Sequence, residues 1–303
     1  MMEKTPFQMK MMTLLPDLEL RCDEPMAKHT SFKIGGPAEI MAFPRNREEL
    51  AQILKASALL DCKPAILGAG TNILAPDEGL PGLTVCLKDC MGGMEQVDET
   101  AICIGAGVTM SRAAVFAAGL GLSGLEFAHG IPGTVGGGVY MNAGAYGGEI
   151  CQVCESVVVM YFDGTTKSFS NEEMQFSYRH SRLEEEDAIV VSATFHLTPS
   201  AEEEIRGTMR TLMGKRSASQ PLDMPSAGSA FKRPVGGYAA ALIDKTGLKG
   251  YRVGGAAVST KHAGFVVNLG DATADDVRNL LRQVSDKVYE AQGIRLEPEV
   301  RIW

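Results

Sequence analysis

Hydrophobic and polar positions follow two patterns along the chain, and together they predict a mixture of helices and strands. Helical spacing occurs at 46–60, at 109–119, in a long segment that opens at 200, at 238–247 and at 273–292. Short apolar runs bounded by turn residues predict strands at 64–68, 83–87, 101–105, 188–197, 264–270 and 294–303, with a strand, turn and strand at 32–44. Asp163-Gly164 lies between two further apolar runs and predicts a hairpin.

The helix boundaries carry their own signals. Asn46 with Glu49, and Ser200 with Glu203, have the spacing of a capping box, in which two side chains satisfy backbone N–H groups at the start of a helix. Thr273 is placed as an N-cap, and Gly293 as the residue that ends the last helix. Because strands and helices mix without regular βαβ alternation, the pattern favours an α+β fold over a doubly wound sheet.

Length, composition and charge narrow the class of protein. A chain of 303 residues is long enough for two or three domains, and the polar, proline-containing segment 213–229 predicts a junction between two of them. The net charge of −8 argues against nucleic acid or a membrane surface as the partner. The sequence has no apolar run of about 20 residues and no signal-peptide core before Pro16, so we expect a cytoplasmic protein.

The seven cysteines do not form a recognisable framework. Cys151 and Cys154 are the one CxxC pair, and neither a second pair nor histidines at ligand spacing follow it. We therefore expect no metal, and cysteines that are reduced, buried thiols.

Two glycine-rich segments are the most informative features of the sequence for predicting a binding site. One is LGAGTN, 67–72, and the other is GLEFAHGIPGTVGGGVYMNAGAYGGE, 124–149, with nine glycines between 124 and 148. The first lacks the third glycine of a Rossmann fingerprint, and no GxxxxGK[ST] occurs. Loops of this kind can hold an anion through successive backbone N–H groups. The absence of basic residues beside them suits the pyrophosphate of a large, mostly apolar cofactor, so the segments predict a dinucleotide site outside the Rossmann scheme.

Seven motifs in order carry a resemblance to a known family. They are LGAGTNIL, the segment 124–149, SYRHS, SAGSAFKRP, GLKGYRVGGAAVS, KHAGFVVN and LEPEVRIW. Their order resembles that of the UDP-N-acetylenolpyruvoylglucosamine reductase family, and the short path from SYRHS to the helix at 200 resembles its compact type II group. The resemblance implies FAD bound in a fold of the vanillyl-alcohol-oxidase type. It implies FAD-binding subdomains at 1–96 and 97–212 and a smaller α+β substrate domain at 213–303.

The resemblance also implies the site residues and their roles. Catalytic residues would be Arg179, which grips the substrate carboxylate, Ser229, which donates a proton, and Glu299, which acts at least partly protonated. FAD would be bound by Gly68, Ala69, Gly70, Thr71, Asn72, Ile131, Gly133, Thr134, Gly136, Gly137, Asn142, Ala143, Gly144 and Ile189. The UDP sugar would be bound by Tyr178, Arg216, Gln220, Arg233, Lys261, His262 and Arg301.

The implied reaction reduces the enolpyruvyl ether of UDP-N-acetylglucosamine enolpyruvate to a lactyl ether, with NADPH as the reductant and the protein as a monomer. Glu297 would lie on the opposite face of the final strand from Glu299 and be an ordinary surface residue. We expect His29, His129, His180 and His196 to be structural residues with satisfied hydrogen bonds. Two alternatives remain open: another FAD-dependent oxidoreductase of alcohols or sugars, and a non-catalytic protein that binds nucleotide sugars.

Overall fold

The structure is a computed structural model that describes residues 4–303. The chain divides into two compact units, each made from separate stretches of sequence. The first unit contains residues 4–22, Ile40–Ala69 and Gly82–Lys215, and the second contains Asp23–Glu39, Gly70–Pro81 and Arg216–Trp303. The predicted limits at 96 and 212 stay a prediction.

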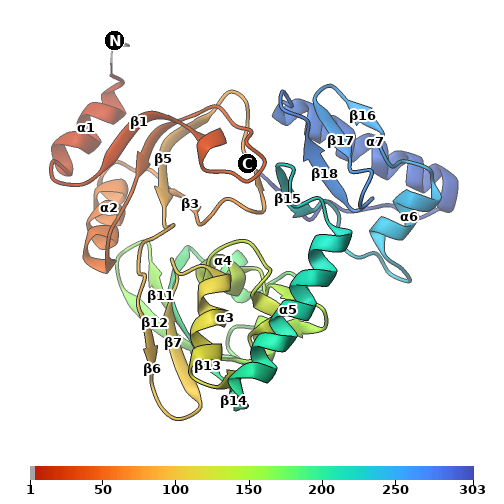
Figure 1. Ribbon diagram of the computed structural model, residues 1–303. Helices are drawn as coiled ribbons and strands as arrows, with labels where there is room; N and C mark the ends of the chain where they lie inside the picture. The colour runs from red at the N-terminus through yellow and green to blue at the C-terminus, as the bar shows by residue number, and fades with distance from the viewer. Residues whose placement is uncertain (1–3) are drawn as a thin grey trace. The chain divides into compact units, whose positions relative to one another are not determined.

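A five-stranded antiparallel sheet is the centre of the first unit (Figure 1). Its strand order is β12-β11-β13-β7-β6. The bounds are β6 Met94–Gln96, β7 Ala101–Gly105, β11 Cys154–Tyr161, β12 Thr166–Ser170 and β13 Ala188–His196. The hairpin predicted at Asp163-Gly164 is confirmed, because β11 pairs with β12 and Gly164 takes a φ of 86° in the turn.

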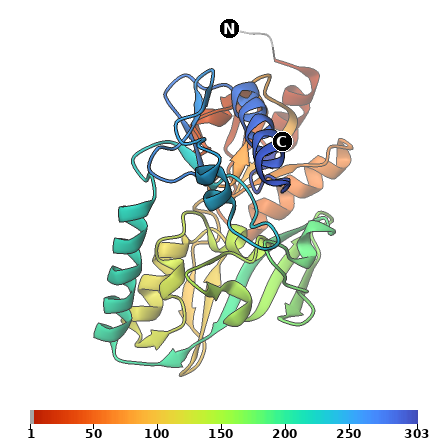
Figure 2. The same cartoon turned by 90° about the vertical axis from the view of Figure 1, so that its right-hand side faces the viewer.

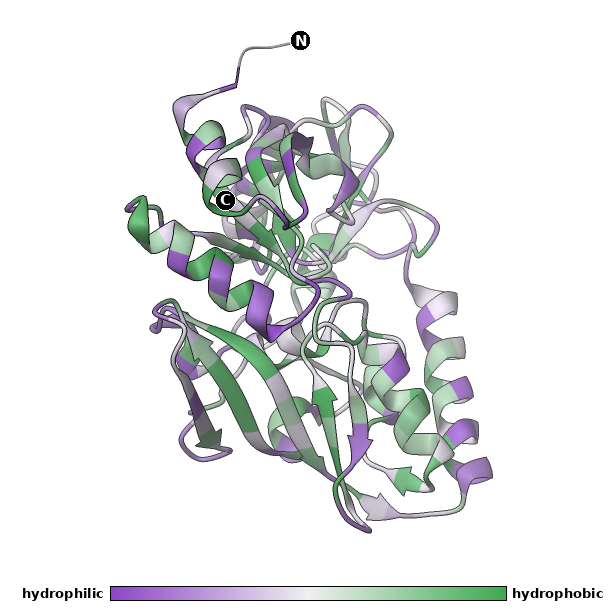
Figure 3. Cartoon of the chain, turned by 90° about the vertical axis from the view of Figure 1, so that its left-hand side faces the viewer, coloured by the Kyte–Doolittle hydropathy of each residue, from purple (hydrophilic) through white to green (hydrophobic). Residues whose placement is uncertain are grey.

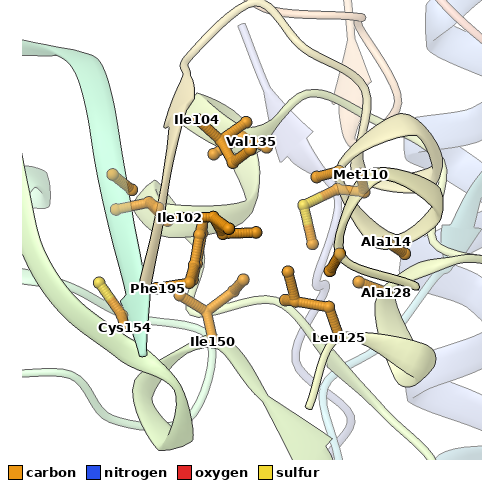
Figure 4. Close-up of a cluster of buried hydrophobic side chains, with 14 of the residues drawn as sticks. Ile102, Ile104, Met110, Ala114, Leu125, Ala128, Val135, Ile150, Cys154 and Phe195 are labelled. Carbon is orange, nitrogen blue, oxygen red and sulfur yellow. The ribbon is translucent and has the colours of Figure 1, made fainter. Parts of the chain in front are cut away.

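Helices pack on one face of this sheet. They are α3 (Met110–Gly119), α4 (Val135–Tyr140) and α5 (Glu202–Ser219), and α3 and α5 lie on the same side (Figure 2). Figure 4 shows Ile102 of β7 and Phe195 of β13 pointing into the same interior as Met110 and Val135. All four side chains are buried, so the alternation of apolar residues along these strands builds the main core.

A second, smaller sheet has the strand order β1-β2-β5-β3. The bounds are β1 Leu20–Pro25, β2 Pro37–Ala42, β3 Ala65–Leu67 and β5 Leu80–Cys86, with helices α1 Pro6–Leu14 and α2 Arg47–Leu59. Apolar side chains of α1, α2 and this sheet form a core cluster that includes Met11, Ile53 and Val85. Figure 3 shows the green of hydrophobic residues interrupted by purple along α2, as expected for a helix with one buried face.

The second unit is built on a four-stranded antiparallel sheet with the order β15-β18-β17-β16. The bounds are β15 Ser226–Ser229, β16 Arg252–Val253, β17 Ala256–Val258 and β18 Phe265–Asn268, with helices α6 Ala239–Lys245 and α7 Ala274–Gln292. The last strand, β19 (Arg301–Ile302), pairs in parallel with β4 (Ile73–Leu74). This pairing attaches the end of the chain to the segment that follows LGAGTN.

Short elements complete the chain. They are η1 Met26–Lys28, β8 Leu122–Ser123, η2 Glu126–Ala128, β9 Gly144–Ala145, β10 Gly148–Glu149, η3 Ile150–Gln152, η4 Arg182–Glu184 and β14 Thr198–Pro199. No helix within residues 4–303 is both long and apolar enough to cross a lipid bilayer.

Three details differ from the sequence predictions. The strand predicted over 294–303 is reduced to Arg301–Ile302. Asn46 caps α2, but the Glu49 carboxylate accepts from the Arg45 N–H and not from Asn46, so the predicted box does not close. The box predicted at Ser200 is also wrong, because α5 begins at Glu202 and the Ser200 hydroxyl donates to the Glu204 side chain.

Candidate active site

The two glycine-rich segments meet in the first unit. A Cβ placed on Gly68 would lie 2.9 Å from Thr134 Oγ1, a distance that real Cβ atoms essentially never show. Thr134 is 3% exposed and caps α4 by accepting a hydrogen bond from the Gly137 N–H at 3.4 Å. Glycine at position 68 therefore allows the loop after β3 to pass directly against the start of α4.

Two glycines inside α4, Gly136 and Gly138, are required by close packing. The N–H groups of Val135, Gly136 and Gly138 donate to the carbonyls of Val108, Ala106 and Thr134 at 2.8, 2.9 and 2.8 Å. A Cβ on Gly136 would lie 2.9 Å from the Ala106 Cβ, and one on Gly138 would lie 2.7 Å from Met110 Sδ. Because these three N–H groups are already bonded inside the unit, Gly136 and Gly138 do not contribute to the predicted anion nest, while the contributions of Gly133 and Gly137 stay a prediction.

Gly70 belongs to the second unit and has a different reason to be glycine. Its φ is 62°, and an added Cβ would lie 2.0 Å from the His29 carbonyl oxygen. The Gly70 carbonyl accepts from the Ser31 N–H at 3.0 Å, while the Ser31 hydroxyl donates to the Ser226 carbonyl at 2.6 Å. Ser31 thus joins the LGAGTN loop to β15, the strand that ends at Ser229.

Two of the residues predicted to be catalytic lie on paired segments of the second unit. The Glu299 N–H donates to the Ala230 carbonyl at 2.9 Å, and Phe231 and Pro298 form an isolated antiparallel bridge. Ser229, the residue before Ala230, is exposed, and a Cβ on Gly228 would meet nothing within 4 Å. The backbone therefore brings Ser229 and Glu299 onto adjacent segments and leaves open space beside the serine.

Asn72 extends this connection to the LGAGTN loop. Its Nδ2 donates to the Glu299 carbonyl at 3.3 Å, and its own carbonyl accepts from the Arg301 N–H at 2.9 Å. Glu297, by contrast, is 69% exposed and forms an ion pair with Lys232. Glu297 is therefore a surface residue in the structure, although the alternation of a long strand is not the reason.

Arg179 lies at the tip of a tight turn in the first unit. The N–H groups of Ser177 and His180 each donate to the other residue's carbonyl, at 3.1 and 3.2 Å. Arg179 takes a φ of 55°, a conformation that costs free energy for a residue other than glycine. Its Nη2 donates to the Gly144 carbonyl at 3.2 Å, and its guanidinium carbon lies 5.2 Å from the centre of the Tyr178 ring.

Several of the remaining residues predicted to bind FAD are buried or pack against a hydrophobic core. Asn142 is 1% exposed and makes only internal hydrogen bonds with its side chain. Ile189 is 3% exposed and packs in the core cluster of the smaller sheet. Ile131 packs against the main core, while Ala143 and Gly144 follow Asn142 in the chain.

Tyr178 lies in the turn beside Arg179, and the other residues predicted to bind substrate lie at the end of α5, in the turns of the second unit and in β19. Lys261 Nζ donates to the Ser217 carbonyl at 2.7 Å, so this lysine also satisfies a carbonyl at the C-terminal end of α5. The Arg233 guanidinium carbon lies 4.1 Å from the centre of the Tyr238 ring. The Oε1 atom of Gln220 is buried without a hydrogen-bond partner in the part of the chain that the structure describes, as expected of a group that meets a ligand.

His262 has a defined tautomer. Its Nδ1 accepts from the Gly264 N–H at 3.1 Å, and its ring packs edge-on against Phe265 with the centroids 5.1 Å apart. Burial lowers the pKa of His262 below its usual value. The neutral ring must therefore carry its proton on Nε2, which makes that atom a hydrogen-bond donor.

His129 is a residue that sequence reasoning missed. The predicted hydrogen bonds are present for His29, with Glu24 at 2.9 Å, and for His196, with Thr100 at 3.5 Å, while His180 Nδ1 lies 3.4 Å from Glu184 Oε2. His129 Nδ1 is instead buried without a hydrogen-bond partner among residues 4–303, so the prediction is wrong there. The available signal was its place between an apolar run and GIPG, where no polar side chain adjoins it in sequence.

The cysteines are free thiols. Burial raises the pKa of Cys154 to about 12 and that of Cys90 to about 11. These thiols stay protonated at neutral pH and are poor nucleophiles. Within residues 4–303, no group of three or more His, Cys, Asp or Glu side chains is arranged to hold a metal ion.

These features fit a dinucleotide cofactor. The two glycine-rich segments touch at Gly68 and Thr134, neither 64–76 nor 130–148 contains a charged residue, and a buried histidine nitrogen beside them lacks a partner. The model of the FAD binding domain matches residues 38–170, which include both segments in full. The fold and the site therefore define an FAD-dependent oxidoreductase of α+β architecture.

Comparison with known proteins identifies the family. The C-terminal domain model of UDP-N-acetylenolpyruvoylglucosamine reductase matches residues 220–303. Reductases of this name from Agathobacter rectalis and Streptococcus pneumoniae are 45% and 43% identical to the chain, over 95% and 97% of both sequences. The crystal structure of the reductase from Thermus caldophilus is 36% identical, with a TM-score of 0.79, and covers 94% of this chain and 98% of its own. The chain belongs to the UDP-N-acetylenolpyruvoylglucosamine reductase family.

Proposed function

We propose that the protein reduces UDP-N-acetylglucosamine enolpyruvate to UDP-N-acetylmuramate with NADPH, for peptidoglycan precursor synthesis. Family membership supports the reaction class. The observation that carries the assignment of residues is the hydrogen bond from the Glu299 N–H to the Ala230 carbonyl, which brings a hydroxyl and a carboxyl group onto adjacent segments. The expectations of a monomer and of a cytoplasmic location stay predictions.

FAD would be held by backbone and small side chains. The candidates are the loop Gly68–Asn72, the segment Ile131–Thr134 with His129, and Gly137, Ala143 and Gly144, while Gly136 and Ile189 support it through packing. The cofactor supplies hydride transfer, from NADPH to the methylene carbon of the enolpyruvyl group. Asn142 makes its three hydrogen bonds within the protein, so we assign it a supporting role.

Arg179 would bind the substrate carboxylate. A planar guanidinium can donate two parallel hydrogen bonds to a carboxylate and stabilises the negative charge that develops on it during reduction. The positive φ of Arg179 supports this role, because backbone strain in a residue other than glycine occurs often at functional sites.

Ser229 would donate the proton to the carbon beside the substrate carboxylate. The open space at Gly228 allows a substrate to approach the serine hydroxyl. Glu299 would act as an acid and donate a hydrogen bond to the enediolate oxygen. The ion pair of Glu297 with Lys232 supports the choice of Glu299 over its neighbour.

The UDP portion would be bound by residues of the second unit, with Tyr178 as a further candidate in the first. Gln220 is the best supported, because its buried Oε1 lacks a partner among the described residues. Arg216, Arg233, Lys261, His262 and Arg301 complete the set. The neutral His262 would contribute a donor at Nε2 and would not transfer a proton.

Separate measurement of the two half-reactions tests this assignment. In stopped-flow absorbance experiments, Ser229→Ala should leave the reduction of bound flavin by NADPH nearly intact and abolish its reoxidation by the enolpyruvyl sugar. Equal loss of both half-reactions would show that Ser229 is not the proton donor. Glu299→Gln, which keeps a donor, should retain more activity than Glu299→Ala, and equal losses would contradict the acid role.

NADH in place of NADPH tests the choice of reductant in the same instrument, since a flavin reduction rate that is equal with both would contradict NADPH preference. Rapid oxygen consumption with a simple alcohol or sugar would instead favour another FAD-dependent oxidoreductase.

A further inference from the structure

The side chain of Asn142 makes three hydrogen bonds inside the protein, and one of them reaches a nearby turn. Its Nδ2 donates to the Ser177 carbonyl at 3.0 Å and to Glu149 Oε2 at 3.1 Å, and its Oδ1 accepts from the Cys151 N–H at 2.9 Å. An amide side chain has two N–H donors, and both are engaged here. With 1% exposure, Asn142 has little surface left with which to meet a ligand.

The contact to Ser177 acts at the base of the turn that carries Arg179. Ser177 and His180 are the paired residues of this turn, and only Tyr178 and Arg179 lie between them. A shift of the Ser177 carbonyl is therefore transmitted to Arg179 through two peptide units.

The C-terminal side of the turn is also hydrogen-bonded to the end of α4. Ser181 is fully buried, and its hydroxyl donates to the Tyr140 carbonyl at 2.8 Å. Tyr140 is the last residue of α4, and Asn142 follows two positions later. The end of α4 thus holds the turn on both sides, before Tyr178 and after His180.

The backbone at both ends of this connection is unusual. Asn142 has a φ of 41° and Arg179 a φ of 55°. Asparagine tolerates this region better than other residues that have a Cβ, whereas arginine needs its surroundings to hold it there. The hydrogen bonds of Asn142 supply such a constraint.

We infer that Asn142 is a positioning residue for Arg179, and that it acts on the reduction of the substrate through the geometry of this turn and not through contact with the cofactor. This inference rests on the proposed function, in which Arg179 binds the substrate carboxylate. Glycines 136 and 138 contribute indirectly, because they allow α4 to pack where its end meets the turn.

A double-mutant cycle tests the inference. The measured quantity is the rate at which the enolpyruvyl sugar reoxidises the reduced flavin, in the wild type, Asn142→Ala, Arg179→Ala and the double variant. We expect Arg179→Ala to slow this step by about 100-fold or more and Asn142→Ala by about 10-fold. The double variant should be no slower than Arg179→Ala alone, because two residues that act as one unit are not additive.

Asn142→Gly provides a second variant if Asn142→Ala does not fold. Glycine adopts the positive φ without strain and places no charge beside Glu149, but it removes both donors. It should slow reoxidation about as much as Asn142→Ala, while the visible spectrum of bound flavin and the temperature at which flavin is released stay close to those of the wild type.

Asn171→Ala is the matched control. Asn171 also bridges two carbonyls with its side chain, those of Cys151 at 2.8 Å and Cys154 at 2.6 Å, and both carbonyls belong to residues outside the turn at 177–180. It should lower thermal stability without a selective effect on reoxidation.

The inference would be overturned if the two single-variant losses in reoxidation rate multiplied in the double variant. It would also be overturned if the flavin spectrum and the release temperature changed as much as the rate. An Arg179→Ala variant with a normal reoxidation rate would instead overturn the proposed role of Arg179.

Discussion

Replacement of Gly70 by alanine tests whether backbone packing dictates the shape of the LGAGTN loop. Gly70 has a φ of 62°, which costs a residue with a Cβ about 1–2 kcal/mol. The added Cβ would also lie 2.0 Å from the His29 carbonyl oxygen, so the backbone of one of the two segments must move. Fitting an extra methyl group into closely packed surroundings costs a further ~1–3 kcal/mol, because neighbouring backbone must shift.

Gly247→Ala is the control for the conformational part of this cost. Gly247 lies in the same unit with a φ of 74°, and a Cβ there would meet nothing within 4 Å. The difference between the two variants therefore isolates the clash with His29. We expect Gly70→Ala to reduce the free energy of unfolding by about 1–3 kcal/mol more than Gly247→Ala does.

The single tryptophan, Trp303, provides the assay. Its backbone N–H donates to the Leu74 carbonyl at 3.1 Å, so its fluorescence reports on the second unit, which contains both glycines. Urea unfolding curves of the two variants and the wild type give the three free energies. Equal values for Gly70→Ala and Gly247→Ala would show that the loop yields without cost and would refute the packing argument.

Three further predictions follow from ionisable and unpaired groups. Burial lowers the pKa of His262, so the unfolded chain binds the proton more tightly than the folded protein does. The free energy of unfolding should therefore fall as pH drops below 6.5, and His262→Gln should remove this part of its pH dependence. Asp276 accepts hydrogen bonds from the N–H groups of Gly255 and Thr273, and these bonds lower its pKa. They stabilise the fold above pH 3.8, and this stabilisation is lost as pH falls further. Asp276→Asn should therefore make the free energy of unfolding depend less on pH in the acid range. His129→Ala should raise the Kd for FAD about 10-fold in a flavin fluorescence titration, whereas His196→Ala should not, and an unchanged Kd for His129→Ala would contradict contact with the cofactor.

Local signals allowed much of the fold to be predicted. The caps at Asn46 and Thr273 and the turn at Asp163-Gly164 act over three or four residues, and the structure confirms them. Helix α1 was missed, although Thr5, Pro6 and Gln8 form a complete capping box with proline in the first turn. The two boxes that failed did so because Glu49 found a partner at Arg45 and Ser200 one at Glu204, choices that spacing alone does not decide.

The sequence predicted which residues belong to the site better than it predicted how they are arranged. The ordered motifs pointed to Ser229 and Glu299, but the backbone bond near them joins residues about seventy positions apart, and no local pattern encodes it. Gly136 and Gly138 do not belong to the predicted nest, because glycine can serve two purposes that look alike in sequence: it can expose an N–H group, or it can allow a close packing contact. The burial of His129 Nδ1 likewise depends on tertiary packing.

The discontinuity of the second unit has a consequence for how the protein is made. Its sheet lies in the last third of the chain, yet it needs 23–39 and 70–81, and β19 must find β4 more than two hundred residues earlier. The β4–β19 pair therefore cannot form until synthesis has passed residue 302. Until then Ile73 and Leu74 lack this partner strand, and closing so long a loop adds to the entropic cost of forming the pair.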